Sequence, residues 1–223
     1  MDCLIIIPSY NESEKIAEVI GSIRNTPGLA CDILVVDDGS SDHTAELAQK
    51  AGAFVISHAI NRGQGAAVRT GIEYLLRRDY QRAVFFDADG QMKAEEIPSL
   101  LAPLALGEYQ VALGSRFLGR TINMPFSKLL TLKLALLFTR LVSGLKLTDT
   151  HNGFQAWSRE ALKLINLTQD RYAYASQILE EIGKYRIKYR EVPVTISYSV
   201  YSKKKGQSIF NAFNIVMDLI LRK

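Results

Sequence analysis

The sequence predicts a single α/β domain in which helices flank a mostly parallel β-sheet, and three features of its 223 residues indicate this fold. Short apolar runs alternate with segments of helical period, about 10–15 residues each. The early runs are apolar throughout, as expected of strands that helices bury on both faces. Polar clusters follow these runs, and open α/β sheets bind ligands at that edge.

The first half of the chain is expected to contain five strands with helices between them. The helices show apolar residues every three to four positions, and the strands end at turn residues or acidic clusters. The predicted strands are 3–7, 32–36, 53–58, 83–86 and 110–114, and the predicted helices are 11–23, 44–51, 66–77 and 97–106. Asn11 or Ser13 is the expected cap of the first helix.

The pattern changes after residue 116, where basic residues become frequent. The predicted elements are a long helix at 126–142, a strand at the end of 149–157, helices at 159–165 and 175–185, a strand at 189–199, a basic loop at 202–208 and a helix at 209–221. These elements divide the chain into a main domain, 1–208, with a basic region on its C-terminal side, and an amphipathic helix at 209–223.

The charge distribution suits an anionic partner. Between Arg116 and Lys146 there are six Lys or Arg residues and no acidic residue, and residues 184–205 contain seven against Glu191 alone. Such a region attracts a phosphate or an anionic membrane surface. The net charge is only +4, and the basic segments lack the interleaved aromatic residues of a base-stacking platform, so no nucleic-acid partner is expected.

The two cysteines, Cys3 and Cys31, form neither a disulfide framework nor a zinc-binding pattern, which fits a reducing compartment. The chain opens directly on a predicted strand, so no signal peptide is expected. No apolar stretch reaches the ~18–20 residues that span a bilayer. The expected location is therefore the cytoplasm.

Asp87 and Asp89 directly follow a predicted buried strand. Two carboxylates at i and i+2 can share one divalent cation, and Mg²⁺ or Mn²⁺ takes oxygen ligands and bridges to a diphosphate. Without a cation, two like charges so close would raise one of the two pKa values. A solvated turn with a helix cap is the alternative, and the position at the ligand-binding edge favours the metal site.

Three other features leave alternatives open. Residues 37–40 either bind a ribose or base or form a turn with a serine helix cap. The glycine-rich loop 61–65 matches neither common phosphate-binding pattern, so a phosphate cradle, a close backbone approach and a plain turn all stay open. His43, His58 and His151 show no metal-ligand spacing and are expected to be structural or surface residues.

Seven short motifs stand in the order found in family 2 glycosyltransferases. They are IIIPSYNE at 5–12, VVDDGSSD at 35–42, NRG at 61–63, FDADGQ at 86–91, GSR at 114–116, DTHNGF at 149–154 and EVPV at 191–194. Over about residues 3–208 the chain resembles the branch that contains dolichol-phosphate mannosyltransferase and polyprenyl-phosphate glucosyltransferases. The resemblance implies the Rossmann-like GT-A fold and an inverting, metal-dependent hexosyltransferase.

The resemblance also implies a role for particular residues. The nucleotide-sugar would be bound by Pro8, Tyr10, Glu12, Asp37, Asp38, Asp87, Gln91, Lys204 and Lys205. The cation, Mg²⁺ or Mn²⁺, would be held by Asp87, Asp89 and Gln91. The acceptor phosphate would contact Arg116 and Arg140, and the catalytic residues would be Asp89, Arg116 and Asp149. The basic loop would fold over the donor diphosphate.

The implied reaction transfers a sugar from a nucleotide-sugar to a polyprenyl phosphate, dolichyl or undecaprenyl, at a membrane surface. A phosphate acceptor is ionised near pH 7 and needs no general base. A sugar hydroxyl, as in surface polysaccharide synthesis, would need one, and Asp149 is the candidate. A non-catalytic nucleotide-sugar-binding subunit is the alternative from another class. A nucleotidylyltransferase is disfavoured, because residues 8–12 replace the glycine-rich loop that such enzymes place after the first strand.

The predicted helix 126–142 is rich in leucine and carries Lys128, Lys133 and Arg140. It is too short and too charged to span a bilayer, but it can lie in the membrane interface. The alternative is a core helix whose lysines extend to solvent. The helix at 209–221 can dock on the membrane in the same way, pair with an integral membrane protein or lead into a longer native chain. The expectation is a peripheral protein at the inner face of the membrane.

Overall fold

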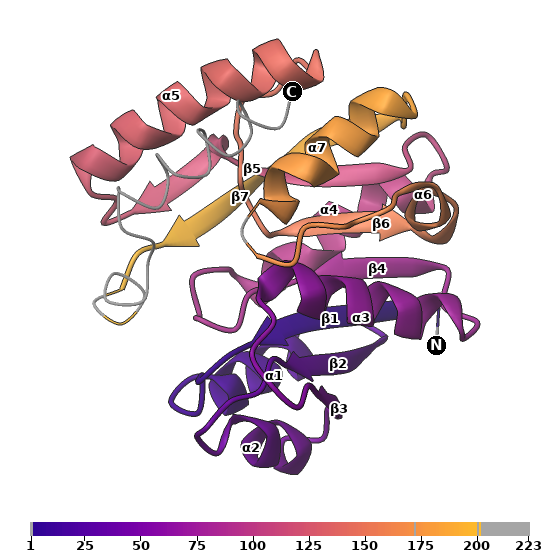
Figure 1. The fold of residues 1–223 in the computed structure, drawn as a ribbon, viewed down its shortest axis with the longest axis vertical. Coiled ribbons are helices and arrows are strands. Elements are labelled where there is room, and N and C mark those ends of the chain that lie inside the picture. Colours follow the sequence, from indigo (N-terminus) through magenta and orange to yellow (C-terminus); the bar gives the residue numbers. More distant parts are fainter. Residues whose placement is uncertain (1, 172, 200, 202–223) are drawn as a thin grey trace.

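One seven-stranded sheet runs through the described part of the chain, with the strand order β3-β2-β1-β4-β6-β5-β7 (Figure 1). The computed structural model describes residues 2–171, 173–199 and 201. Only β6 runs antiparallel to its neighbours, β4 and β5, and the other neighbouring strands of this described sheet are parallel. The predicted fold, α/β with a mostly parallel sheet, is confirmed.

Strands and helices alternate in the order that the sequence predicts. The first half contains β1 (Cys3–Ser9), α1 (Ile16–Arg24), β2 (Cys31–Asp37), α2 (Thr44–Lys50), β3 (Phe54–Ser57), α3 (Gln64–Leu76), β4 (Arg82–Phe85), a short 3₁₀ helix η1 (Ala94–Glu96) and α4 (Ile97–Ala105). The second half contains β5 (Val111–Ile122), α5 (Phe126–Ser143), β6 (Gln155–Ser158), α6 (Arg159–Leu164), α7 (Tyr174–Lys184) and β7 (Tyr189–Ser197).

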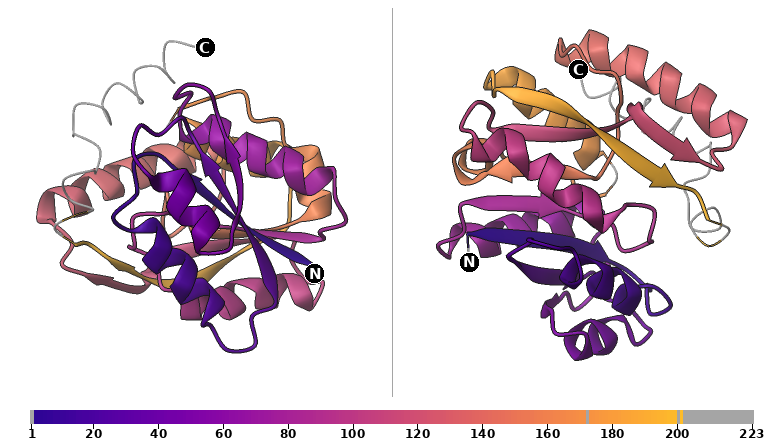
Figure 2. Two further views of the ribbon diagram at one scale, coloured as in Figure 1. Left: turned by 90° about the horizontal axis from the view of Figure 1, so that it is seen from below. Right: turned by 180° about the vertical axis from the view of Figure 1, so that it is seen from behind.

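Helices lie on both faces of the sheet (Figure 2), and a hydrophobic cluster fills the space on each face. Successive side chains of a strand point to opposite faces. Ile5 and Ile7 of β1 therefore pack with α1 and α4, whereas Leu4 and Ile6 pack with α3, α6 and α7. All four side chains are fully buried, which explains why this strand is apolar throughout rather than alternating.

The strand β5 is longer than predicted, because it ends at Ile122 rather than at residue 114. Its second part pairs with β7 after a register shift, so that Arg120 lies opposite Thr195 and Ile122 opposite Ser197. This part carries polar and basic residues, which hid the strand from the apolar pattern. This second part of β5 lies next to the start of α5.

The predicted start and caps of the first helix are wrong. The helix α1 begins at Ile16, and no side chain caps it. Asn11 has a left-handed backbone (φ 54°), and its side-chain oxygen accepts the backbone N–H of Ser41 at 2.9 Å. The backbone N–H of Ser13 donates to Asp42. Both residues therefore join the loops after β1 and β2 instead of capping a helix.

The helix α5 lies at the end of the molecule beyond β5 and β7 (Figure 1). One of its faces packs inward, where Leu132 is buried and Leu136 is partly buried against the core. The opposite face is a stripe of exposed large apolar side chains, which we call the α5 stripe: Phe126, Leu130, Leu134, Leu137 and Leu141. The helix therefore has one face packed against the core and one exposed apolar face, so it is not a fully buried core helix.

In the part of the chain that the structure describes, no helix combines the length and apolar character needed to cross a membrane. The predicted basic loop 202–208 and the predicted helix 209–221 lie outside the described residues, so the proposed boundary at residue 208 stays a prediction.

Candidate active site

A cavity of about 660 Å³ opens at the carboxyl ends of β1, β2 and β4. Seven of the residues predicted for the nucleotide-sugar and the metal line it, namely Pro8, Tyr10, Glu12, Asp38, Asp87, Asp89 and Gln91. We call this space the donor cavity. Of the other predicted nucleotide-sugar residues, Asp37 is not in its wall, and Lys204 and Lys205 lie outside the described residues.

Hydrogen bonds hold the loop after β1 in place. The backbone N–H of Asn11 donates to the hydroxyl of Ser40 at 2.8 Å, and that of Glu12 donates to the hydroxyl of Thr44 at 2.7 Å. The carboxylate of Glu12 accepts the hydroxyl of Tyr201 at 2.7 Å. Residues beyond β7 therefore reach the rim of the donor cavity, next to the predicted basic loop.

The two aspartates after β2 have different surroundings. Asp37 is buried, and its carboxylate accepts both the backbone N–H and the hydroxyl of Ser40, so it stabilises the turn. Asp38 lies 2.7 Å from Nδ1 of His58 and accepts the backbone N–H of Gly63 at 2.6 Å. Asp38 therefore fixes the glycine-rich loop against the cavity wall, and His58 is a structural residue.

The backbone of the glycine-rich loop lies close to the backbone of residues 169 and 170. Such a close approach is one of the three alternatives predicted for this loop. A Cβ added at Gly65 would lie 2.1 Å from the carbonyl oxygen of Gln169, and one at Gly63 would lie 2.5 Å from that of Asp170. No side chain fits in that space, which explains why glycine stands at both positions. The approach brings Arg171 to the wall of the donor cavity.

Among the described residues, no cationic side chain donates a hydrogen bond to the acidic pair. Asp87 accepts the side-chain amide of Gln64 at 3.2 Å, and Asp89 accepts the backbone and side-chain N–H groups of Gln91 at 3.0 and 2.6 Å. Burial and the charge of Asp89 raise the pKa of Asp87 to about 7, against the opposing effect of Arg116. Burial also raises the pKa of Asp89. Burial thus disfavours the negative charge of the pair, and the nearby Arg116 and the amides of Gln64 and Gln91 offset only part of this effect.

The acidic pair fits a magnesium or manganese ion. Its carboxylates, with the amide oxygen of Gln91, are the hard oxygen donors that these cations take. Within the described residues, no group of three or more His, Cys, Asp or Glu side chains is arranged to hold a metal by itself. The protein would thus supply one or two carboxylates, and a diphosphate and water the rest, which is common for Mg²⁺.

Arg116 is buried, with 6% of its surface exposed, and the protein engages its side chain on several sides. Its Nε donates to Asp149 at 2.7 Å, and one terminal nitrogen donates to the hydroxyl of Tyr198 at 2.8 Å. The other lies 3.4 Å from the carbonyl oxygens of Thr150 and His151. The predicted phosphate-binding and base roles of Arg116 and Asp149 stay predictions, because here each residue mainly binds the other.

The ion pair orders the 149–154 loop beside the acidic pair. The carboxylate of Glu191 accepts the backbone N–H groups of Thr148 and Asp149, which accounts for the EVPV motif. A Cβ added at Gly153 would lie 2.8 Å from the carboxylate of Asp87. The glycine in this motif therefore allows the loop to touch the acidic pair.

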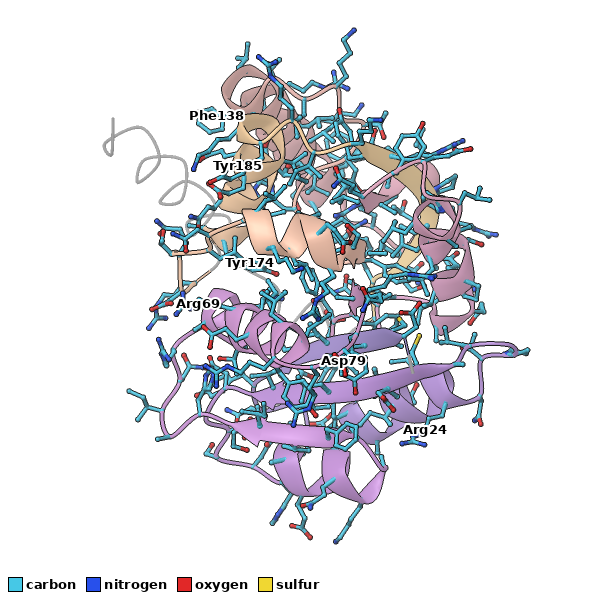
Figure 3. The ribbon with its side chains drawn as sticks, turned by 90° about the vertical axis from the view of Figure 1, so that its right-hand side faces the viewer. Arg24, Arg69, Asp79, Phe138, Tyr174 and Tyr185 are labelled. Atoms are coloured by element: carbon cyan, nitrogen blue, oxygen red, sulfur yellow. The ribbon has the colours of Figure 1, made fainter. Side chains whose placement is uncertain are left out.

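Some residues of the donor cavity were not predicted from the sequence. They are Lys128 of α5, His151, Asn152, Gln155, Arg171 and Tyr174. Tyr174 stands at the start of α7, on the side that faces α3 (Figure 3). Burial lowers the pKa of His151 to about 4, so its imidazole is neutral at pH 7. Burial and the charge of Arg116 also lower the pKa of Lys128.

Arg140 lies away from this cavity. Its Nε donates to the carbonyl oxygen of Leu147 at 2.7 Å, near the C-terminal end of α5, and its side chain is not part of the cavity wall. Its predicted contact with an acceptor phosphate stays a prediction. Lys128, on the same helix, does line the cavity. The sequence did not distinguish these two basic residues, because the way α5 packs determines which of them faces the cavity.

Comparison with known proteins agrees with the fold. The family model described as "Glycosyl transferase family 2" matches residues 4–165. The structure of glucosyl-3-phosphoglycerate synthase from Mycobacterium tuberculosis, in complex with Mn²⁺, uridine diphosphate and glucosyl-3-phosphoglycerate, matches with a TM-score of 0.78 at 20% identity. That match covers 99% of this chain and 79% of the other and shows the fold alone.

Relatives by sequence match most or all of the chain. An uncharacterised protein of Methanocaldococcus jannaschii is 34% identical over 100% of this chain and 92% of its own length. The UDP-N-acetylglucosamine–dolichyl-phosphate N-acetylglucosaminyltransferase of Methanococcus voltae is 30% identical over 98% and 95%. The polyprenol monophosphomannose synthase of Mycolicibacterium smegmatis is 36% identical over 78% and 69%.

The fold and the site define a glycosyltransferase of the GT-A architecture. Within that class, the chain belongs to glycosyl transferase family 2.

The buried ion pair predicts a large effect on stability. Replacing Asp149 with Asn should lower the free energy of unfolding by about 3–5 kcal/mol, because the Arg116 charge would remain buried without a partner. The measurement is urea unfolding of the purified protein. The control is Asp79→Asn, at an exposed side chain. It should change the free energy of unfolding by less than about 0.5 kcal/mol.

The double variant Arg116→Met with Asp149→Asn tests the reason given for that loss. It should regain part of the stability, because no unpaired charge stays buried. A single Asp149→Asn variant as stable as the unaltered protein would contradict the structural role of this pair.

Proposed function

We propose that this protein is an inverting glycosyltransferase that moves a sugar from a nucleotide-sugar to a polyprenyl phosphate at a membrane surface. The observation that carries the proposal is one cavity that holds the acidic pair Asp87 and Asp89 together with the cationic side chain of Lys128. The acidic pair would hold the cation that binds the donor diphosphate, and the lysine would bind the acceptor phosphate. The names of two relatives, for transfer to dolichyl phosphate and for a polyprenol monophosphomannose, support the acceptor class.

The donor would lie along the edge of the parallel strands. Pro8, Tyr10 and Glu12 would contact the nucleoside, with Tyr10 presenting a ring that is 46% exposed. Asp87 and Asp89 would hold Mg²⁺ or Mn²⁺ beside the diphosphate. When bound, this cation neutralises negative charge that grows on the departing nucleoside diphosphate. Arg171, Lys204 and Lys205 are the proposed further contacts of that diphosphate.

The acceptor phosphate would bind at Lys128. A phosphate oxygen would attack the anomeric carbon as the bond from that carbon to the donor diphosphate breaks, which inverts the configuration. A phosphate is already ionised near pH 7, so no side chain has to remove a proton. The buried charge of Arg116 adds positive potential behind Lys128. The carboxylate of Asp149, which a hydroxyl acceptor would need as a base, is engaged by Arg116.

The α5 stripe supports binding to a membrane surface. Five large apolar side chains are exposed along one helix, and Lys133 and Arg140 are exposed on it as well. Apolar side chains can enter the acyl boundary while cations contact lipid phosphates. We therefore propose a peripheral protein at the cytoplasmic face of the membrane, where an integral membrane protein is a further candidate partner.

Release of nucleoside diphosphate tests the proposed transfer. With a panel of nucleotide-sugars, release should require Mg²⁺ or Mn²⁺ and a polyprenyl phosphate. Asp89→Asn should slow it by at least about a hundredfold, because charge on the leaving group is no longer offset. Asp79→Asn, the exposed control, should leave the rate unchanged. Release that ignores the lipid phosphate would contradict the acceptor assignment.

The acceptor site can be tested separately from the donor site. Lys128→Ala should raise KM for the polyprenyl phosphate about tenfold or more, because a charge-assisted contact is lost. Lys128→Arg should bring this KM part of the way back to that of the unaltered protein. Lys163→Ala, on the exposed side of α6, should leave the KM unchanged. Titration with the nucleotide-sugar should show unchanged donor affinity for Lys128→Ala. An unchanged KM for the lipid would remove Lys128 from the acceptor site.

Membrane binding can be measured by co-sedimentation with vesicles that contain an anionic lipid. The double variant Leu134→Glu with Leu137→Glu should bind at least about tenfold more weakly, because charges replace apolar groups of the α5 stripe. Leu106→Glu, at a side chain 72% exposed after α4, is the control. Equal binding by both variants would show that the α5 stripe is not the membrane-facing surface.

A further inference from the structure

A second cavity, of about 590 Å³, lies between the end of β5 and the start of α5. Its volume falls within the ~300–1,000 Å³ of small-molecule sites. Its apolar wall is made by Phe117, Met124, Phe126 and Leu129, and its polar wall by Arg116, Arg120, Thr121 and Asn123. The described side chains proposed to contact the donor, the cation and the acceptor phosphate line the donor cavity, so none of those contacts uses the second cavity.

The helix α5 contributes side chains to both cavities. Lys128 lines the donor cavity, and the next residue, Leu129, lines the second cavity. Neighbouring Cα atoms are about 3.8 Å apart. Arg116 is in the wall of the second cavity, and its charge acts on Lys128. The second cavity is therefore close enough to Lys128 for the first carbons of a chain whose phosphate contacts that lysine.

The second cavity also connects to the exposed apolar surface. Phe126 lines it, is 79% exposed and is the first residue of the α5 stripe. No acidic side chain occurs between Arg116 and Lys146, so no carboxylate from this segment opposes a phosphate near the cavity. Phe126 therefore belongs both to the second cavity and to the α5 stripe, and Lys128 lies on the same helix.

We infer that the second cavity binds the first isoprene units of a polyprenyl phosphate, those next to the phosphate. This inference rests on the proposed function and adds a recognition site for the carbon chain of the acceptor. The charge of Lys128 matches the phosphate, and the apolar wall matches the branched hydrocarbon next to it. Acceptor binding should therefore strengthen with chain length until the cavity is filled, by about fourfold for each methylene fully buried.

The experiment measures KM for a series of prenyl phosphates with 5, 10, 15 and 20 carbons, from the release of nucleoside diphosphate at saturating donor. For the unaltered protein, KM should fall by at least about tenfold from the C5 to the C15 phosphate. Leu129→Trp and Thr121→Trp, from α5 and β5, each place an indole in the cavity. Each should reduce that KM ratio to about twofold. Leu106→Trp is the exposed control and should keep it.

Longer chains also partition more strongly into detergent, so the comparison is between variants in the same detergent. Donor titration shows which variants are folded, and if Leu129→Trp does not bind donor, Thr121→Trp decides. The same KM ratio in the unaltered protein and both folded cavity variants would overturn the inference and leave transfer to prenyl phosphates intact. If no prenyl phosphate supports release by the unaltered protein, the proposed function itself fails, and the inference fails with it.

Discussion

The site is arranged around the mutual repulsion of two carboxylates at the edge of the sheet. Asp87 and Asp89 are held close together because they follow β4 directly, and the hydrogen bonds that they accept come from the amides of Gln64 and Gln91. These donors are neutral, and the charge of Arg116 offsets only part of the effect of burial and of the mutual repulsion on Asp87. A divalent cation with a diphosphate completes such a site, since each brings charge or oxygen ligands that the protein does not supply.

The buried pair of Arg116 and Asp149 provides the rigid support for this arrangement. It joins β5 to the loop that carries Gly153, and that glycine lets the loop backbone approach Asp87. Two sequence motifs far apart in the chain therefore act as one structural unit. The positive charge of Arg116 stays behind the cavity wall, whereas Lys128 reaches the cavity itself. The protein thereby separates a structural cation from one that can contact an acceptor.

The sequence predicted the elements whose pattern is local and missed those that depend on packing. Asp87 could be placed because a buried parallel strand ends just before it. Lys128 could not be assigned, because the face of α5 that turns inward is set by contacts with distant elements. Arg171 reaches the cavity through a loop without a motif. The true role of Asn11 depends on its hydrogen bonds with the loop after β2.

The most direct test of the account identifies the product of the reaction. The protein would be incubated with a labelled nucleotide-sugar, a divalent cation and a polyprenyl phosphate, and the lipid extract would be analysed by mass spectrometry and NMR. The expected product is a lipid in which the anomeric carbon is bonded to the phosphate, with configuration inverted from the donor. A sugar joined to a hydroxyl group, or one that keeps the configuration of the donor, would contradict it.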